Sequence, residues 1–137
     1  MKRYTEEVIT NLEPYEVFVF GSNEAGSHGG GSALAAYKNF GAKWGISFGL
    51  TGNSFAIPTV NKSIEKLDKE KLLEYLKRFI QFAKDNKQYT FLFTKIGCGI
   101  AGFKIEEMRE LFWKSVELSN DGCLPNNIVY PIEFELL

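Results

Sequence analysis

VFVFGSNEAGSHGGGSALAAYKNFG (residues Val17–Gly41) combines a strand, a glycine-rich loop and the start of a helix, and the rest of the chain can be interpreted around it. Val17–Phe20 is an apolar run without alternation, which predicts a strand buried on both faces. The glycine-rich segment then leads into a helix expected over Ser32–Phe40. A helix N-terminus presents free backbone N–H groups and the positive end of the helix dipole. We therefore expect an anion to bind at this junction.

Apolar patterning divides the remaining chain into alternating strands and helices. The expected elements are strands at Ser54–Pro58, Tyr89–Ile96 and Ile128–Phe134, and helices that run from an N-cap at Asp68 to about Asn86 and over Ile105–Leu118. Residues 42–53 are expected to be a loop, residues 1–15 are a short lead-in, and Pro131 suggests that the last strand lies at an edge. The alternation predicts a single α/β domain (residues 1–137), a three-layer α/β/α fold with a mainly parallel, mixed central sheet.

Composition narrows the classes of function. The chain has 137 residues, 45% hydrophobic and 24% charged, with a formal net charge of −1, so no basic field for bulk nucleic-acid binding is expected. No apolar run is long enough to span a membrane and no signal peptide is recognisable, which predicts a cytoplasmic protein without a membrane partner. Cys98 and Cys123 are not in a metal or redox spacing, so neither a metal nor a cofactor is expected. The oligomeric state is left open.

A second glycine-rich turn strengthens the interpretation of the first. Gly97–Gly102 reads GCGIAG and again follows an apolar strand and precedes a helix. Gly29-Gly30-Gly31 alone could be a flexible turn, and neither loop matches the common phosphate-binding patterns. Two such turns in one small domain are harder to explain by chain reversal. If the two preceding strands are neighbours, the loops face one another across a single ligand crevice at the carboxyl edge of the sheet.

Polar side chains in the two loops each have a functional and a structural interpretation. The Asn23 amide could hold a ribose hydroxyl or a water, or it could close an internal Asx turn. His28, the single histidine, could act as an acid or base, although a lone loop histidine is more typically a surface side chain. Cys98 occupies a nucleophile-like position, but without an identifiable partner a small buried filler is the favoured interpretation.

Three aromatic residues could stack on a ligand. The faces of Phe103, Trp44 and Phe48 suit a base or a ribose. For Trp44 and Phe48, burial in the core is the favoured interpretation.

The motifs GSN, AIPT and KIGCGIAGF together resemble macrodomains, most closely the short macro-like proteins of phage and bacterial origin. Asn23 and Gly29-Gly30-Gly31 resemble the first ligand loop of that family, and Lys95–Phe103 resembles its second, phosphate-embracing loop. The resemblance covers about residues 16–134. Macrodomains bind ADP-ribose and related nucleotides, and some hydrolyse ADP-ribosyl groups from proteins, nucleic acids or metabolites.

The resemblance implies which residues contact the ligand. The loop after Gly97 would wrap the diphosphate with its backbone N–H groups, and Gly29–Ser32 would lie against the distal ribose. Asn23 and His28 are the candidate catalytic residues, and Glu24 is a weak candidate for the adenine contact. The full set of expected ligand-binding residues is Gly21, Ser22, Asn23, Gly29, Gly30, Gly31, Ser32, Gly97, Cys98, Gly99, Ile100, Ala101, Gly102 and Phe103.

The chain departs from the family at the catalytic positions. One macrodomain class has an aspartate after the triple glycine, where this chain has Ser32 and Ala33. Another has a lysine after the second strand and an aspartate in the second loop, where this chain has Pro58-Thr59-Val60 and Gly99-Ile100-Ala101. Lys62 lies two residues late to replace that lysine. The expected function is therefore binding of ADP-ribose or a related nucleotide, with an ADP-ribosyl hydrolase and a non-catalytic sequestering protein for a nucleotide signal as alternatives.

Overall fold

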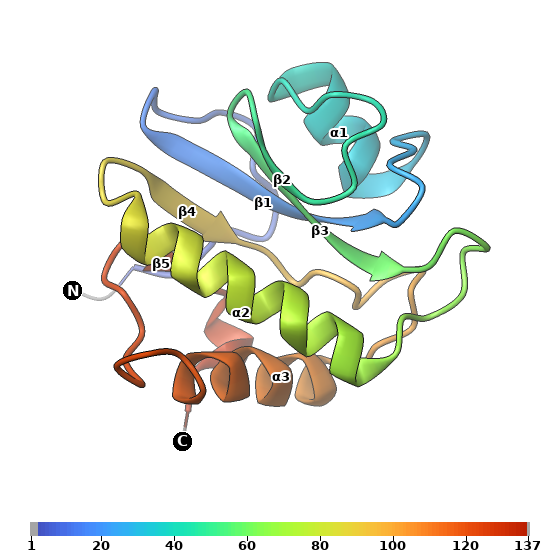
Figure 1. Cartoon of the computed structure of the whole chain (residues 1–137). Helices are drawn as coiled ribbons and strands as arrows, with labels where there is room; N and C mark the ends of the chain where they lie inside the picture. Colours follow the sequence, from blue (N-terminus) through green and yellow to red (C-terminus); the bar gives the residue numbers. More distant parts are fainter. Residues whose placement is uncertain (1–2, 137) are drawn as a thin grey trace.

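A five-stranded sheet separates one helix from two others in the computed structural model, which describes residues 3–136 (Figure 1). The elements are β1 (Glu16–Asn23), α1 (Gly31–Asn39), β2 (Gly49–Thr51), β3 (Ser54–Val60), α2 (Lys69–Asp85), β4 (Thr90–Phe93), α3 (Ile105–Glu117), β5 (Ile128–Val129) and the 3₁₀ turn η1 (Ile132–Phe134). The strand order is β2-β3-β1-β4-β5, and only β2 runs antiparallel to its neighbour. The predicted α/β/α fold with a mostly parallel, mixed sheet is confirmed.

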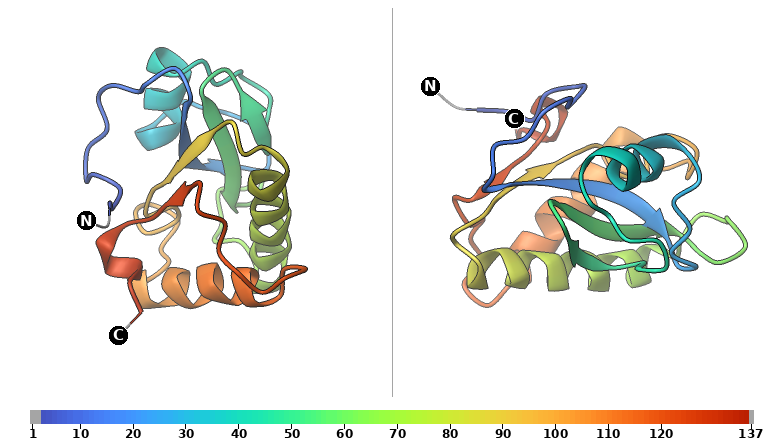
Figure 2. Two further views of the ribbon diagram at one scale, coloured as in Figure 1. Left: turned by 90° about the vertical axis from the view of Figure 1, so that its left-hand side faces the viewer. Right: turned by 90° about the horizontal axis from the view of Figure 1, so that it is seen from above.

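The central strand β1 is buried on both faces because its side chains alternate between two apolar clusters. Val17 and Val19 pack with α2 and α3 in the larger cluster, whereas Phe18 and Phe20 pack with α1 in the smaller one. The left view in Figure 2 shows α1 on one side of the sheet, with α2 and α3 on the other. The uninterrupted apolar run of β1 follows from this double coverage, as predicted.

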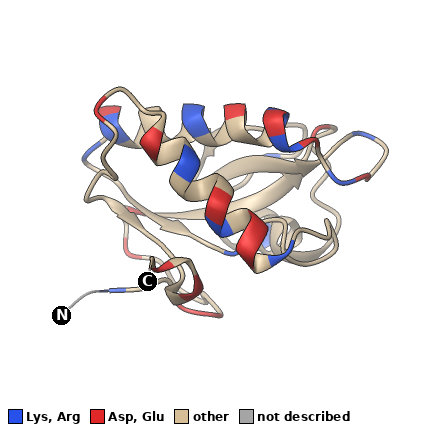
Figure 3. Ribbon diagram, turned by 90° about the horizontal axis from the view of Figure 1, so that it is seen from below, with Lys and Arg blue, Asp and Glu red and all other residues tan. Residues whose placement is uncertain are grey.

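The helices lie close to where the apolar spacing placed them. Each helix begins and ends within one residue of its expected boundaries, and Asp68 occupies the N-cap position of α2. Leu72, Leu76 and Phe79 of α2 are fully buried, while positive and negative residues are interspersed along the ribbons of α2 and α3 (Figure 3). The charged positions of Lys66–Lys77 thus belong mainly to a solvated helix surface.

The strands differ more from expectation. Residues 42–53 were expected to be a loop but contain β2, which pairs with Ser54–Ala56. Beyond Ala56, where the pairing with β2 ends, β3 continues past Pro58 to Val60, and Val60 forms an isolated bridge with Lys66. The missing N–H of Pro58 therefore costs no hydrogen bond to a strand on that side.

The last two strands are shorter than expected. The Thr94 hydroxyl donates to the Val19 carbonyl at 2.7 Å just after β4 ends. β5 is an edge strand that stops at Val129, and Pro131 precedes the turn η1 instead of lying within a strand. The predicted edge position is correct, but the predicted strand end at Phe134 is wrong.

The described part of the N-terminal lead-in, residues 3–15, crosses the α1 side of the sheet without forming a helix or strand. Its Ile9 and Leu12 pack against the smaller apolar cluster. The backbone N–H of Thr5 donates to the Tyr130 carbonyl at 2.9 Å, which fixes the segment beside the end of β5. The lead-in therefore covers sheet surface that α1 leaves open.

Candidate functional site

The two glycine-rich loops leave the same edge of the sheet because β1 and β4 are parallel neighbours. A Cβ added at Gly21, near the end of β1, would lie 3.4 Å from the backbone nitrogen of Gly97. The second loop therefore begins against the end of β1, the strand from which the first loop departs. We refer to residues 24–30 as the first loop and residues 97–102 as the second loop.

The first loop ends at a helix N-terminus that carries no side-chain cap. Gly30 is the N-cap of α1, no side chain bonds to the cap, and the first turn contains no acidic residue. The N–H groups of Gly31, Ser32 and Ala33 make no hydrogen bond within residues 3–136. A Cβ at Gly30 or Gly31 would meet nothing within 4 Å, so the backbone faces open space. This is the arrangement in which a helix N-terminus can receive an anion.

The first loop is held internally by Asn23. Its amide nitrogen donates to the Ser27 carbonyl at 2.8 Å, and its oxygen accepts the Ser27 N–H at 3.0 Å. The structure thus has the internal turn that was one of the two interpretations of Asn23. The oxygen and the NH₂ group each retain one further hydrogen-bonding position for a ligand.

Glycine contacts fix the first loop against residues 41–52. The N–H of Gly45 donates to the Gly26 carbonyl at 2.8 Å. A Cβ at Gly26 would lie 2.5 Å from the carbonyl carbon of Gly45, and one at Gly52 would lie 2.7 Å from the Cα of Gly41. Gly26 has a φ of +73°, so both conformation and space require glycine there.

His28 is fully buried, which corrects the expectation of a surface side chain. Its Nε2 lies 2.9 Å from the Lys43 carbonyl, so Nε2 carries the proton and donates. The ring packs against Phe20, Tyr37 and Trp44 at centroid distances of 5.6, 6.4 and 5.9 Å. The other nitrogen, Nδ1, has no partner among the described residues. These contacts position the first loop and leave the His28 ring without exposed surface.

The second loop divides its backbone N–H groups between internal turns and solvent. Those of Cys98, Gly102 and Phe103 donate to carbonyls of the same segment. The N–H groups of Gly99, Ile100 and Ala101 make no hydrogen bond within the part of the chain that the structure describes. Ile100 is 91% exposed, so the loop tip is open. Consecutive free N–H groups form a concavity suited to an anion.

Phe103 and Cys98 connect the second loop to the larger apolar cluster. Phe103 is 3% exposed and belongs to the larger apolar cluster, and the Lys66 ammonium lies 4.5 Å from the centre of its ring. Cys98 is partly buried against the larger cluster, and burial raises the pKa of its thiol. A raised pKa disfavours the thiolate, which is consistent with the interpretation of Cys98 as a filler.

Glu24 and Lys62 are not brought to the open glycine backbone. The Glu24 carboxylate pairs with the Lys71 ammonium at 2.7 Å and accepts from the Tyr75 hydroxyl at 2.9 Å. The hydrogen bond from Lys71 holds the pKa of Glu24 below its usual value. Lys62 is exposed, and its charge also lowers the pKa of Glu24. Glu24 therefore ties the first loop to α2. Ser22, which is buried, donates from its hydroxyl to the Ser47 carbonyl.

Trp44 is a second residue, after His28, that sequence reasoning misplaced. It was expected in the core, but it is 54% exposed and lies beside the first loop, with its Cη2 3.9 Å from a Cβ added at Gly29. Phe48 is only partly buried, and it packs against the larger cluster. The signal available in the sequence was the polar and glycine neighbourhood of Trp44, since Lys43 and Gly45 flank it.

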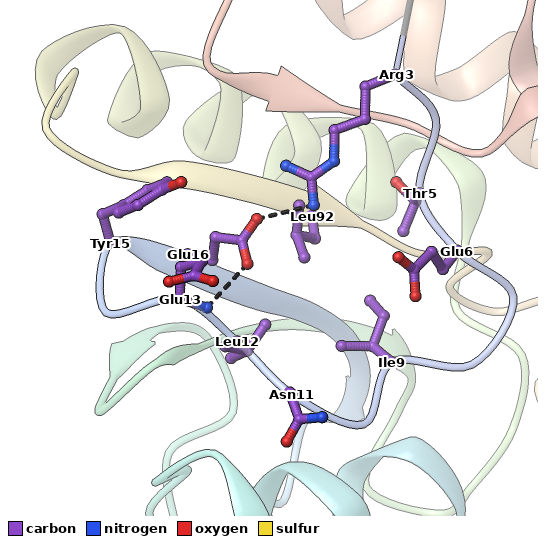
Figure 4. Close-up of a pocket in the computed structure, with 10 residues that line it drawn as sticks. All are labelled: Arg3, Thr5, Glu6, Ile9, Asn11, Leu12, Glu13, Tyr15, Glu16 and Leu92. Carbon is purple, nitrogen blue, oxygen red and sulfur yellow. Dashed lines mark hydrogen bonds and ion pairs between the residues drawn. The ribbon is translucent and has the colours of Figure 1, made fainter.

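A cavity of about 350 Å³ lies away from the two loops, between the N-terminal segment and β4 (Figure 4). The buried carboxylate of Glu16 pairs there with Arg3 at 2.8 Å and accepts the Glu13 N–H at 2.9 Å. Glu16 is the first residue of β1, so this cavity is at the opposite end of the strand from the first loop. The two glycine loops are exposed at Gly29, Gly30, Gly99 and Ile100, whereas Gly26 and His28 of the first loop are buried.

Two general features were searched among residues 3–136. No helix there combines the length and apolar character needed to cross a membrane. No group of His, Cys, Asp or Glu side chains there is arranged to hold a metal ion.

Comparison with known proteins supports the fold. Neither the protein-family models nor the curated protein sequences give a match. A solved structure described as a protein of unknown function from Bacteroides thetaiotaomicron is similar, with a TM-score of 0.56 and 17% identity. The match covers 89% of this chain and 90% of that chain. At this identity the similarity extends to the architecture alone.

Proposed function

We propose that the protein binds ADP-ribose or a related nucleotide, with the phosphates on the backbone of the two glycine loops. The supporting observation is that two sets of three backbone N–H groups are open. One set is Gly31–Ala33 and the other is Gly99–Ala101, and they follow the parallel neighbouring strands β1 and β4. Backbone N–H groups with no side chain in the way suit phosphate oxygens, which are strong acceptors. The resemblance of GSN, AIPT and KIGCGIAGF to macrodomain motifs points to the same ligand class.

Binding without turnover is the form of this proposal that the titratable groups favour. His28 is buried with Nε2 bonded to the Lys43 carbonyl, and Glu24 is paired with Lys71 and Tyr75. Neither is therefore available as a general base at the exposed glycines. A protein that sequesters a nucleotide signal would need only such a site.

The first test is calorimetric titration with ADP-ribose, with AMP and NAD in parallel. A Kd of micromolar or lower, about −8 kcal/mol, is expected for ADP-ribose. Absence of any heat of binding with all three ligands would refute the proposal. Incubation with ADP-ribosylated protein and DNA then separates binding from hydrolysis, since no release of ADP-ribose is expected.

Gly30→Glu places a carboxylate at the proposed anion site and should reduce ADP-ribose affinity by about 100-fold or more, through charge repulsion. Gly30 has an extended φ of −158° and open space around its Cβ, so the fold should tolerate the change. Gly30→Gln is the matched control, since it adds similar bulk without charge. Equal affinities of the Glu and Gln variants would contradict an anion at this position.

A further inference from the structure

The exposed face beside the first loop belongs to two aromatic side chains. Trp44 is 54% exposed and Tyr37 is 45% exposed. Their ring centroids lie 5.5 Å apart at an interplanar angle of 78°. The Cη2 of Trp44 lies 3.9 Å from a Cβ added at Gly29, two residues before Gly31, where the open N–H groups proposed to hold phosphate begin.

The structure fixes Trp44 in place although its side chain is not needed in the core. The Lys43 carbonyl accepts from buried His28, and the Gly45 N–H donates to the Gly26 carbonyl. The residues on both sides of Trp44 are therefore bonded to the first loop itself. An aromatic ring that is held rigidly and left exposed loses little entropy when it binds a ligand.

Charge around this aromatic pair has a single sign over a long stretch of sequence. Residues 25–64 contain Lys38, Lys43 and Lys62 and no aspartate or glutamate. The stretch includes the first loop after Glu24, together with α1, β2 and β3, and the Glu24 carboxylate itself is paired with Lys71. It is complementary to an anionic ligand, although the whole chain carries a net charge of −1.

We propose that Trp44, flanked by Tyr37, is a stacking subsite for the planar base of a nucleotide whose phosphates lie on the glycine loops. This inference rests on the proposed function and names where the heteroaromatic ring goes. Bases stack on aromatic side chains without requiring a particular sequence of hydrogen bonds. A phosphate-bearing ligand with a planar ring satisfies the open N–H groups, the positive charge and the exposed tryptophan together.

Fluorescence gives a direct readout, because the other tryptophan, Trp113, lies in α3 and donates to the Phe134 carbonyl. Trp113→Phe leaves Trp44 as the single tryptophan. Saturable quenching by ADP-ribose and AMP, but not by inorganic pyrophosphate at concentrations that displace ADP-ribose, is the expected result. Quenching by pyrophosphate to the same extent would overturn base stacking.

Trp44→Leu should weaken ADP-ribose binding by about 10-fold, the usual scale for loss of one base–aromatic stack. Trp44→Phe is the matched control and should retain most of the affinity. The inhibition constant of pyrophosphate against ADP-ribose should be unchanged, since pyrophosphate has no ring. An equal loss for both ligands would mean that Trp44 only shapes the loop, and would overturn the subsite.

The failures of the two proposals can be distinguished. If Trp44→Leu binds ADP-ribose with wild-type affinity while Gly30→Glu does not, the base lies elsewhere and the proposed function stands. If the wild-type chain binds none of the nucleotides, both fail. Concentration-dependent association by light scattering that Trp44→Leu abolishes would assign the aromatic pair to a second copy of the chain instead.

Discussion

The two loops that meet at the carboxyl edge of the sheet lead into helices whose first turns are opposite in character. At α1, the N-cap residue is Gly30, no side chain makes a capping hydrogen bond, and the first turn contains no acidic residue. At α3, the Lys104 N–H donates to the Glu107 carboxylate at 2.9 Å, and Glu106 and Glu107 lie in the first turn. One helix N-terminus is open, and the other already holds an anion of its own.

This difference assigns separate tasks to two loops that look alike in sequence. Glu107 also pairs with Lys69 at 2.9 Å and Lys66 at 3.3 Å, so its position at α3 is well fixed. Under the proposed function, a ligand phosphate would have the helix N-terminus of α1 available, whereas at the second loop it would have only the tip, Gly99–Ala101. A glycine-rich turn before a helix is thus not sufficient to identify an anion site; the first turn of the helix must also lack a carboxylate.

The largest effect is expected for Gly26→Ala, which breaks the support of the open N-terminus. The new Cβ would clash with the backbone of Gly45, and alanine disfavours the φ of +73°. A loss of about 3 kcal/mol or more in the free energy of unfolding should follow, measured by urea denaturation. Gly99→Ala in the second loop is the control, since its Cβ meets nothing within 4 Å. Equal stability of the two variants would mean that the glycine contact does not hold the first loop.

A smaller loss is expected for His28→Ala. Removing this buried ring leaves a cavity beside Phe20 and deletes the hydrogen bond to the Lys43 carbonyl, at a cost of about 2 kcal/mol. Thermal unfolding measures the effect, and His28→Gln, which keeps an N–H donor, should recover part of it. If the wild-type protein does release ADP-ribose, and the Ala variant keeps wild-type stability but loses that activity, His28 would be supported as a catalytic residue.

The smallest effect is expected for Glu107→Gln, and it depends on pH. The hydrogen bond from the Lys104 backbone, followed by the Lys69 and Lys66 ammonium groups, lowers the pKa of Glu107 from 4.5 to about 2. Because the folded-state pKa is depressed, the carboxylate stabilises the fold above pH 4.5, and this stabilisation is lost as the pH falls towards 2. Wild type should be more stable than the variant at pH 6, and the gap should close by pH 2. A gap that does not change with pH would exclude the carboxylate charge as its cause.

Residue patterns with one strong physical cause were predictable from the sequence. The run Val17–Phe20 could be assigned to a buried strand because apolar side chains without alternation need cover on both faces. The edge strand β2 could not be predicted, since Gly49-Leu50-Thr51 is too short to show a period and pairs only because β3 offers a free edge. The position of the two loops at the same edge of the sheet was predictable from the parallel topology. The glycine pattern did not predict that the first turn of α3 contains carboxylates and that the first turn of α1 contains none.

Single side chains in the site were less predictable because tertiary partners decide their roles. His28 is buried by rings from β1, α1 and the segment before β2, and its hydrogen bond goes to a backbone carbonyl that no motif marks. Trp44 is large and apolar, and composition alone favours the core for such a residue. Its exposure follows from the glycine contacts that fix the backbone on either side of it.

Those glycine contacts also offer a means of recognising related chains. Gly26 against Gly45 and Gly41 against Gly52 are approaches of backbone to backbone, and substitution at Gly26 or Gly52 would force the two segments apart. We expect positions under such a constraint to change more slowly than the surface around them. A search pattern that requires both glycine pairs, with a tryptophan at the position of Trp44 between Gly41 and Gly45, would select distant homologues by this backbone geometry.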